Sequence, residues 1–370
     1  MEIYTKDHPT HIKAHTGLRG IAAVSVITLH IHFDLLFPDN WIYVTSFLTA
    51  WFPVDVFFIL SGFILGYMYV DATSGEKGLR NSEGYRSFYW KRFARIYPLH
   101  LLTIVLAGVM ALMAVAVGLP NRGYYLSDLP SQLLLIHTFP YIELGGWNHP
   151  SWSISMEMLA YILAFPILVK FWKNRSDDSI TVLVIVALSV LWVFFGHGTS
   201  GWGAVTRVLT NFTIGFAIFK LSESNGGVSK FCTRFVTYFL FAYLVFYIST
   251  RLIKVDSLFR AGVLHAFLIP VILGTVRGTD KIAAKLLGCR LFVWFGVISY
   301  SIYMMHTLFG KVINATRKYL PESEFLNLII GGVTLAAIFV VSSLVYRYFE
   351  IPLRNWITTR TVSRHPKPIE

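Results

Sequence analysis

The sequence contains little charge and little cysteine. Only 14% of its 370 residues are charged, and its two cysteines, Cys232 and Cys289, are far apart in the chain. A soluble globular protein carries about 25% charged residues, so this composition excludes that class. Cysteines outside any C-x-x-C spacing argue against a disulfide framework and a zinc site. The sequence also lacks a phosphate-binding glycine loop, a G-x-S-x-G elbow and any metal-ligand spacing, and we expect no metal.

Long apolar segments are what the sequence has instead. Hydrophobic residues make up 55% of the chain, and an apolar stretch of about 20 residues can cross a bilayer as a helix. A shorter stretch at 128–142 is interrupted by Pro130 and Pro140, which predicts a re-entrant or interfacial segment. We therefore predict an all-α integral membrane protein with about ten transmembrane helices in a bundle. The predicted spans are 17–36, 45–70, 95–119, 153–172, 179–196, 202–220, 232–250, 258–276, 291–311 and 325–348.

The basic residues predict how the chain is oriented. A net charge of +12 could indicate a nucleic-acid partner, but the lysines and arginines lie in short loops between apolar spans, so we expect no nucleic acid and membrane lipids as surroundings. With the N-terminus in the cytoplasm, about three quarters of them fall on the cytoplasmic side, which predicts that both termini are cytoplasmic. The expected organisation is a cytoplasmic segment 1–16, a transmembrane domain 17–350 and a short basic tail 351–370.

Arg19 and His30 lie eleven residues apart in the first span. Eleven steps of 100° return to nearly the same helix face, about 16 Å further along the axis. The first helix should therefore carry a guanidinium near one membrane edge and an imidazole deeper in the bilayer, both pointing the same way. Ionisable groups are costly in hydrocarbon and indicate functional pathways, and an imidazole can act as a general base near neutral pH.

Two further spans carry carboxylates. Asp55 lies near the middle of the second span and needs a cationic or hydrogen-bonding partner there, for which Arg19 or His30 of the first helix would serve. A structural ion pair and a functional role are both open for Asp55. Glu157 lies about one turn inside the fourth span, with Ser153 four residues earlier on its face. This carboxylate could orient an imidazole or bind sugar hydroxyls.

Cations and aromatic residues complete the set of candidates. Arg92 and Arg95 share a helix face in a cytoplasmic basic cluster, where two guanidiniums could hold phosphates. Arg207 lies within the sixth span, and Tyr303 and His306 are three residues apart in the ninth. Tyrosine and histidine near a membrane edge can also be an interfacial aromatic belt, and that alternative is open.

The order of these motifs resembles the acyltransferase-3 family of bacterial membrane O-acyltransferases over about residues 15–355. The family includes acetyltransferases of O-antigen, exopolysaccharide and Nod factor, and this chain is similar to its stand-alone type. The matching segments are Gly17-Leu-Arg19-Gly with His30, Val54-Asp55-Val-Phe-Phe-Ile-Leu-Ser-Gly-Phe63, Arg92-Phe-Ala-Arg95-Ile-Tyr-Pro98, Ser151-Trp-Ser-Ile-Ser-Met-Glu157, Ser299-Tyr-Ser-Ile-Tyr303-Met-Met-His306 and Tyr348-Phe-Glu350-Ile-Pro352.

The resemblance implies an enzyme of the bacterial inner membrane. It would transfer an acyl group, most simply acetyl, from cytoplasmic acyl-CoA to a sugar hydroxyl on the outer side, with no tightly bound cofactor. The acceptor would be a polysaccharide repeat unit, a lipid-linked oligosaccharide or another glycoconjugate. The implied roles are phosphate binding by Arg92 and Arg95, lining of the donor channel by Arg19, base or acyl-histidine chemistry at His30, orientation by Asp55 or Glu157, and substrate binding by Ser153, Arg207, Tyr303 and His306.

Two other functions fit a bundle with buried ionisable groups. A proton-coupled transporter is one, although carriers are often built from internal repeats with paired broken helices, which this sequence does not show. A non-catalytic subunit of the polysaccharide machinery is the other. An assay of CoA release separates both from the enzyme.

Overall fold

The structure is a computed structural model that describes residues 12–30, 53–70, 82–118, 123–142, 147–172, 177–224, 226–253, 257–276, 278–317, 319–321 and 323–362. Within these ranges every regular element is a helix, which confirms the all-α prediction. The helices of the bundle, with the short segments η4 and η5 that continue α6 and α15, are α1 (Lys13–His30), α3 (Pro53–Tyr69), α4 (Ser82–Ala116), α6 (Ser151–Leu159), η4 (Ala160–Ala164), α7 (Phe165–Phe171), α8 (Asp178–Phe195), α9 (Gly201–Glu223), α10 (Gly227–Leu252), α11 (Ser257–Thr275), α13 (Arg290–Val297), α14 (Ser299–Arg317), α15 (Glu324–Val345), η5 (Tyr346–Glu350) and α16 (Ile351–Val362).

Each predicted apolar span falls on one or more of these helices. Six helical segments of the described chain are long and apolar enough to cross a membrane, and α13 with α14, bent by 72°, would be a seventh. Helices α3 and α11 are apolar but shorter, and residues 31–36 and 45–52 of the first two predicted spans lie outside the described residues. The chain is thus an all-α membrane protein, and the total of ten spans stays a prediction.

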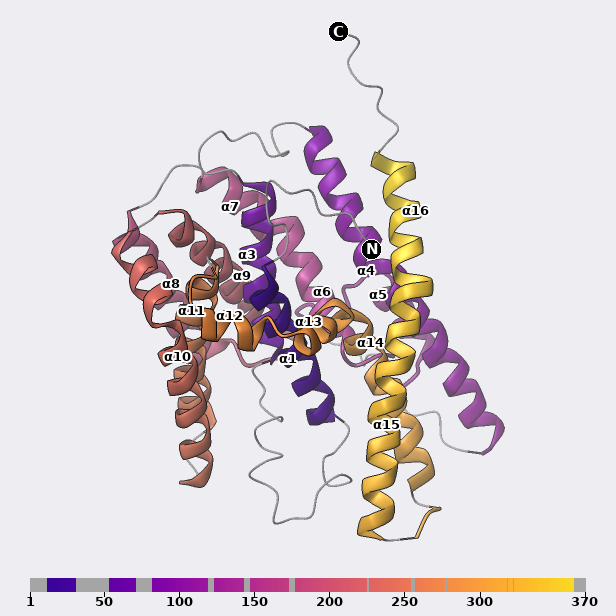
Figure 1. The fold of residues 1–370 in the computed structure, drawn as a ribbon. Coiled ribbons are helices and arrows are strands. Elements are labelled where there is room, and N and C mark those ends of the chain that lie inside the picture. The colour runs from indigo at the N-terminus through magenta and orange to yellow at the C-terminus, as the bar shows by residue number, and fades with distance from the viewer. Residues whose placement is uncertain are drawn as a thin grey trace.

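The helix ends alternate between two sides of the molecule. The N-terminal end of α4 and the C-terminal ends of α7 and α16 lie at the top in Figure 1, whereas the C-terminal end of α10 and the N-terminal end of α15 lie at the bottom. These ends of α4, α7 and α16 thus lie on one side of the molecule, and those of α10 and α15 lie on the other. The cytoplasmic location of the two termini stays a prediction, and residues 1–11 and 363–370 lie outside the described chain.

The segment predicted to be re-entrant or interfacial contains two short helices. These are η3 (Leu126–Asp128) and α5 (Leu129–Leu133), with Pro130 in the first turn of α5, where a missing N–H is tolerated. The segment packs beside α4, because His100 Nε2 donates to the carbonyl oxygen of Gln132 at 2.9 Å. Its depth in the membrane stays a prediction.

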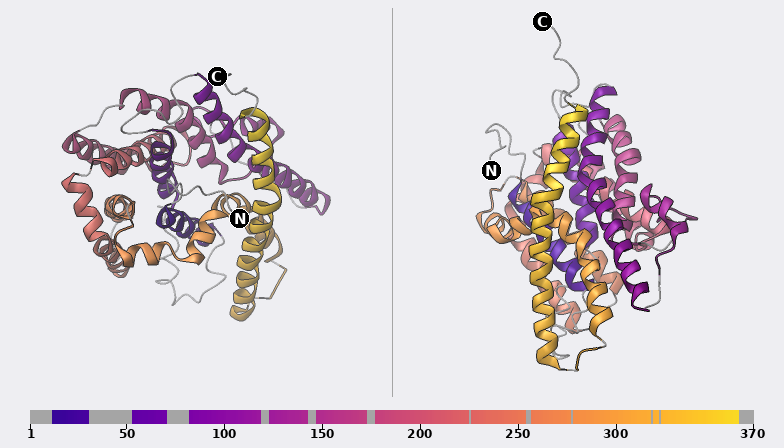
Figure 2. Two further views of the ribbon diagram at one scale, coloured as in Figure 1. Left: turned by 45° about the horizontal axis from the view of Figure 1, so that its top comes forward. Right: turned by 90° about the vertical axis from the view of Figure 1, so that its right-hand side faces the viewer.

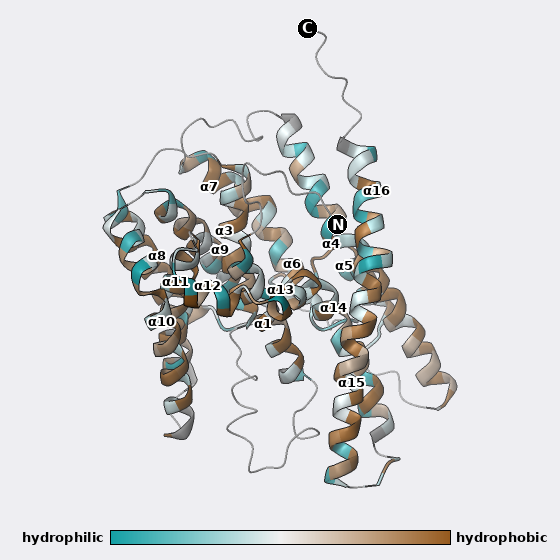
Figure 3. Ribbon diagram, viewed as in Figure 1, coloured by the Kyte–Doolittle hydropathy of each residue, from teal (hydrophilic) through white to brown (hydrophobic). Residues whose placement is uncertain are grey.

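Helices α1, α3 and α9 form the interior of the bundle. Figure 2 shows α1 and α3 surrounded by other helices. In the most apolar 18-residue stretch of α9, 78% of the residues are buried, against 17% in the corresponding stretches of α8 and α10. The outer helices expose apolar side chains, such as Leu112 and Met113 of α4, and the C-terminal half of α4 is mainly hydrophobic in Figure 3. Such an outer surface suits hydrocarbon, where every backbone polar group must be satisfied within its own helix.

Glycines set the closest helix contacts. Gly62 of α3 and Gly215 of α9 face each other, and Gly17 and Gly20 of α1 lie against α12 (Lys281–Leu287) and α13. A Cβ atom at Gly215 would overlap the carbonyl oxygen of Ile59. Small residues permit this approach of backbones, which is a main source of helix association in membranes.

Gly215→Ala is expected to destabilise the protein, because either α3 or α9 must shift to admit the methyl group, and such overpacking costs about 1–3 kcal/mol. Gly332→Ala in α15 is the matched control, because no other group lies within 4 Å of a Cβ there, and alanine is the better helix former. Thermal unfolding in detergent measures both. Equal unfolding temperatures for the two variants would contradict the close packing.

Candidate active site

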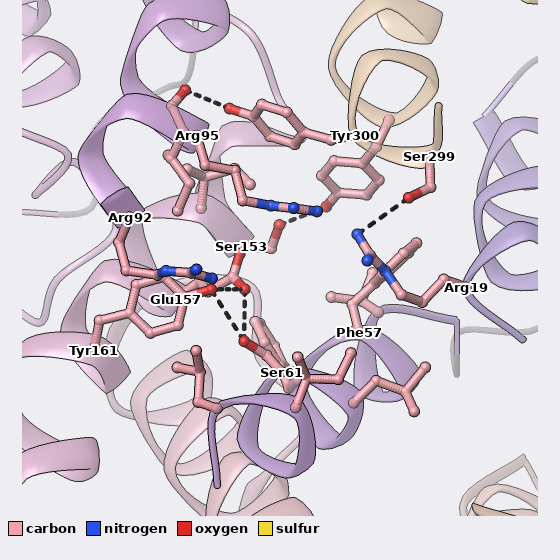
Figure 4. A pocket seen from close by; sticks show the side chains of 18 of the residues that line it. Arg19, Phe57, Ser61, Arg92, Arg95, Ser153, Glu157, Tyr161, Ser299 and Tyr300 are labelled. Carbon is pink, nitrogen blue, oxygen red and sulfur yellow. Dashed lines mark hydrogen bonds between the residues drawn. The ribbon is translucent and has the colours of Figure 1, made fainter. Parts of the chain in front are cut away.

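A cavity of about 190 Å³ lies where α1, α3, α4, α6 and α14 meet (Figure 4). Side chains from all five helices reach it, and η4 adds Tyr161. The sequence-predicted site residues among its lining are Arg19, Arg92, Arg95, Ser153, Glu157 and Tyr303. The bundle therefore brings together residues that are up to 284 positions apart between Arg19 and Tyr303.

Three guanidinium groups surround this cavity. Arg19 Nη2 donates to Ser299 Oγ at 3.3 Å. The Arg92 guanidinium carbon lies 5.9 Å from the ring centroids of Tyr69 and of Phe88, and its buried Nε has no hydrogen-bond partner in the described chain. Arg95 lies on the same face of α4, as the three-residue spacing predicts. This arrangement concentrates positive charge and N–H donors, which suits an anionic ligand.

Glu157 is the carboxylate inside the cavity. Its Oε1 accepts hydrogen bonds from Ser61 Oγ at 2.9 Å and from the Tyr161 hydroxyl, and Ser61 and Tyr161 are themselves 3.0 Å apart. Figure 4 shows these three side chains together beside Arg92. Bound in this way, Glu157 is held in one orientation in the cavity wall.

Sequence reasoning missed two residues that line this cavity, Ser61 and Tyr161, and a buried carboxylate that attracts one of its arginines. Ser61 carried no signal beyond its place in the second-span motif, and Tyr161 had one available signal, its position four residues after Glu157 on the same face. Glu350, from the closing motif, is buried, accepts from Ser301 Oγ at 2.7 Å and attracts Arg95. Its contribution could not be read from spacing, because η5 is far from α4 in the sequence.

Tyr303 separates the cavity from a second polar region. Ser153 Oγ donates to the Tyr303 hydroxyl oxygen at 2.8 Å, and the Tyr303 ring packs against Phe57 with centroids 5.9 Å apart. The centroid of His306, on the next turn of α14, is also 5.9 Å from that of Tyr303. The tyrosine thus contacts the cavity on one side and a histidine on the other.

His30 lies in this second region, within a cluster of three histidines. Its ring centroid is 5.0 Å from that of His306 and 5.8 Å from that of His149. His30 Nδ1 donates to the carbonyl oxygen of Val26 at 3.0 Å. A carbonyl can only accept, so the neutral ring carries its lone pair on Nε2. Arg19 and His30 both contact α14, which confirms that they share one face of α1.

His149 occupies the exposed end of this cluster, in the loop before α6. The neighbouring Asn148 holds that loop on α14, with Nδ2 donating to the Met304 carbonyl oxygen at 2.9 Å and Oδ1 accepting from Thr307 at 2.6 Å. Partial burial, and then the nearby His30 and Lys311, lower the pKa of His149. The imidazole is therefore neutral at pH 7 and available as a proton acceptor.

The partner of Asp55 differs from the one expected. A residue of the first helix was expected, but the partner is Arg207 of α9, which donates to both carboxylate oxygens at 2.8 Å. Asn211 and Trp192 also donate to Oδ1, at 2.7 and 3.2 Å. Both members of the pair are buried, and the Arg207 guanidinium lies 5.2 Å from the Trp152 ring centroid. The pair joins α3 to α9, and neither member lines the cavity.

Comparison with known proteins agrees with this architecture. The family model described as "Acyltransferase domain" matches residues 13–347. The chain belongs to this family. Its relatives include the Acyltransferase MdmB of Streptomyces mycarofaciens, which is 34% identical over 158 residues, covering 41% of this chain and 38% of that protein.

Two longer matches span most of the chain. The Peptidoglycan O-acetyltransferase OatA of Listeria monocytogenes is 23% identical over 96% of this chain and 58% of its own length. The Nodulation protein 10 of Rhizobium leguminosarum bv. viciae is 24% identical over a match that covers 79% of this chain and 82% of the relative's own length. The chain thus spans less than two thirds of the first two relatives. No solved structure matches it significantly.

Proposed function

We propose that this protein is a membrane O-acyltransferase. It moves an acyl group, most simply acetyl, from acyl-CoA to a sugar hydroxyl. The observation that carries the proposal is one cavity with three guanidiniums, whose lining includes Tyr303, a direct neighbour of the histidine cluster. The named acyltransferase and O-acetyltransferase relatives support the reaction class.

The donor would enter from the side on which α4 begins. Arg92 and Arg95 lie near that end of α4 and could hold the phosphates of CoA by charge-assisted hydrogen bonds, which are about twice as strong as neutral ones. Arg19 lies deeper, fixed by Ser299. Since Arg19 and His30 are about 16 Å apart along α1, the pantetheine arm must extend past Tyr303 to bring the thioester to His30.

The reaction would then require a base and an attacking oxygen. His30 Nε2 takes the proton of the sugar hydroxyl, the oxygen attacks the acyl carbonyl carbon, and the C–S bond breaks as the C–O bond forms. The proton passes to the departing CoA sulfur. A transient acyl-histidine at the same Nε2 is the alternative sequence of steps. The exposed His149 and the loop before α6 form the side from which the acceptor would approach.

The acceptor we propose is a saccharide at the outer side of the bacterial inner membrane. Relatives named for peptidoglycan O-acetylation and for nodulation support a carbohydrate acceptor. A polysaccharide repeat unit or a lipid-linked oligosaccharide is the form that we expect a membrane-embedded site to receive.

Arg92→Ala and Arg95→Ala are each expected to raise the KM for acetyl-CoA by about 10-fold or more, because a hydrogen bond to a charged group contributes about 1.5–3 kcal/mol. CoA thiol release by the purified protein in nanodiscs measures this, with acetyl-CoA compared against S-acetylpantetheine, which lacks the nucleotide phosphates. Both variants should lose preference for acetyl-CoA, and Arg86→Ala, at an exposed position of the same helix, should keep it. A folded wild type that neither binds nor turns over acetyl-CoA would overturn the proposal and favour a transporter.

A further inference from the structure

His306 has a buried ring nitrogen that the reaction described above does not use. Its Nδ1 donates to the Tyr303 carbonyl oxygen at 2.7 Å, so the neutral ring carries its lone pair on Nε2. The residue is 0% exposed, and Nε2 has no hydrogen-bond partner within the described chain. A buried polar atom without a partner costs about 1–3 kcal/mol. Other buried histidines of the described chain, such as His15 and His100, also have such a nitrogen, and what distinguishes His306 is that its ring packs against that of His30.

The nearest ring to His306 is that of His30. The two rings lie edge to face, 66° apart, with centroids separated by 5.0 Å. Both have the same tautomer, because each Nδ1–H is engaged by a backbone carbonyl of its own helix. Two such neutral rings offer each other no N–H at Nε2. A proton added to His30 Nε2 supplies the missing donor.

We propose that His306 is the proton-sharing partner of His30, a positioning residue that acts through it and rests on the proposed function. When His30 takes the hydroxyl proton, its new Nε2–H donates to His306 Nε2, and the pair shares one proton until it passes to the CoA sulfur. No atom is gained or lost: O–H and C–S break, and C–O and S–H form. A second proton on the pair is opposed by repulsion between adjacent buried cations.

The other groups around the pair fit this assignment. Tyr303 contacts His306 from α14, His149 faces His30 from the loop before α6, and Lys311 lies near His149. Lys311 Nζ is engaged by the Tyr124 hydroxyl at 2.6 Å and the Trp147 carbonyl oxygen at 2.9 Å. The described chain places no carboxylate among the ring and hydrogen-bond contacts of His306. The contact to the base histidine's Nδ1–H that an aspartate makes in a Ser-His-Asp triad comes here from the Val26 carbonyl, and His306 acts at the other nitrogen.

The test is His306→Asn, whose amide can still donate to the Tyr303 carbonyl but has no Nε2 lone pair. We expect kcat for CoA release from acetyl-CoA, with a methyl glycoside or water as acceptor, to fall about 10²-fold, with the KM for acetyl-CoA within threefold. The acid limb of the pH–rate profile should move to lower pH, because His30 loses the acceptor that stabilises its protonated form. His100→Asn, at a buried histidine bonded to a backbone carbonyl outside the cavity, should change neither.

Retention of wild-type kcat, or a loss of kcat with an unmoved acid limb, would overturn the assignment, since a structural role predicts no shift of the profile. If His306→Asn does not fold, a pH titration of the wild type with ¹⁵N-labelled histidine, followed by NMR, decides. One proton shared by two Nε2 atoms should shift the His30 and His306 resonances together, and a shift confined to His30 would contradict the pair. Absence of turnover in the wild type would overturn the proposed function itself, which keeps the two failures distinct.

Discussion

Replacing His30 by alanine is expected to lower kcat for CoA release from acetyl-CoA by about 10²–10⁴-fold, the usual contribution of a positioned base. The affinity for acetyl-CoA should stay within threefold, because Arg19 lies about 16 Å from His30 along α1 and the other two guanidiniums of the cavity belong to α4. His30→Asn should be as inactive as His30→Ala, since it can restore the donor to the Val26 carbonyl but not the Nε2 lone pair. Binding by calorimetry and turnover by thiol assay separate the two effects.

His15→Asn is the control for His30. This buried histidine lies on the same helix and bonds to the Ile272 carbonyl oxygen at 3.0 Å, outside the cavity and the histidine cluster. It should alter stability without altering kcat of the folded protein. If His30→Ala turns over at the wild-type rate, His30 is not the base, and another group of the cavity must take the hydroxyl proton.

Asp55→Ala is expected to destabilise the protein by about 3–5 kcal/mol, because it leaves the Arg207 guanidinium buried without its counter-charge. Asp55→Asn should cost less, since one amide oxygen can still accept from Arg207 or Asn211. Chemical or thermal unfolding in detergent gives the free energies. The double variant Asp55→Leu with Arg207→Met should be more stable than Asp55→Ala, because replacing both charges by apolar groups leaves neither one unpaired.

Turnover by Asp55→Asn decides between the two roles that the sequence leaves open for this carboxylate. We expect the folded variant to keep kcat within threefold, because the pair joins α3 to α9 and neither member lines the cavity. A loss of 100-fold or more in a fully folded Asp55→Asn protein would instead support the catalytic role implied by the family resemblance.

The sequence by itself determined the features that depend on helix periodicity and transfer energy. Low charge and long apolar runs require helices in a membrane, since hydrocarbon leaves backbone groups no other partner. Spacings of eleven, three and four residues placed Arg19 with His30, Arg92 with Arg95, and Ser153 with Glu157 on common faces, and the members of each pair point the same way in the structure. These relations are local, so one helix is enough to determine them.

The tertiary structure alone decided which helices face each other. It paired Asp55 with Arg207 rather than with the first helix, bound Glu157 to Ser61, and brought His306 to His30. Periodicity gives the direction of a side chain from its own axis but not the neighbour it meets. That neighbour is set by close packing at glycines such as Gly62 and Gly215, where van der Waals contact between backbones fixes the order of the helices.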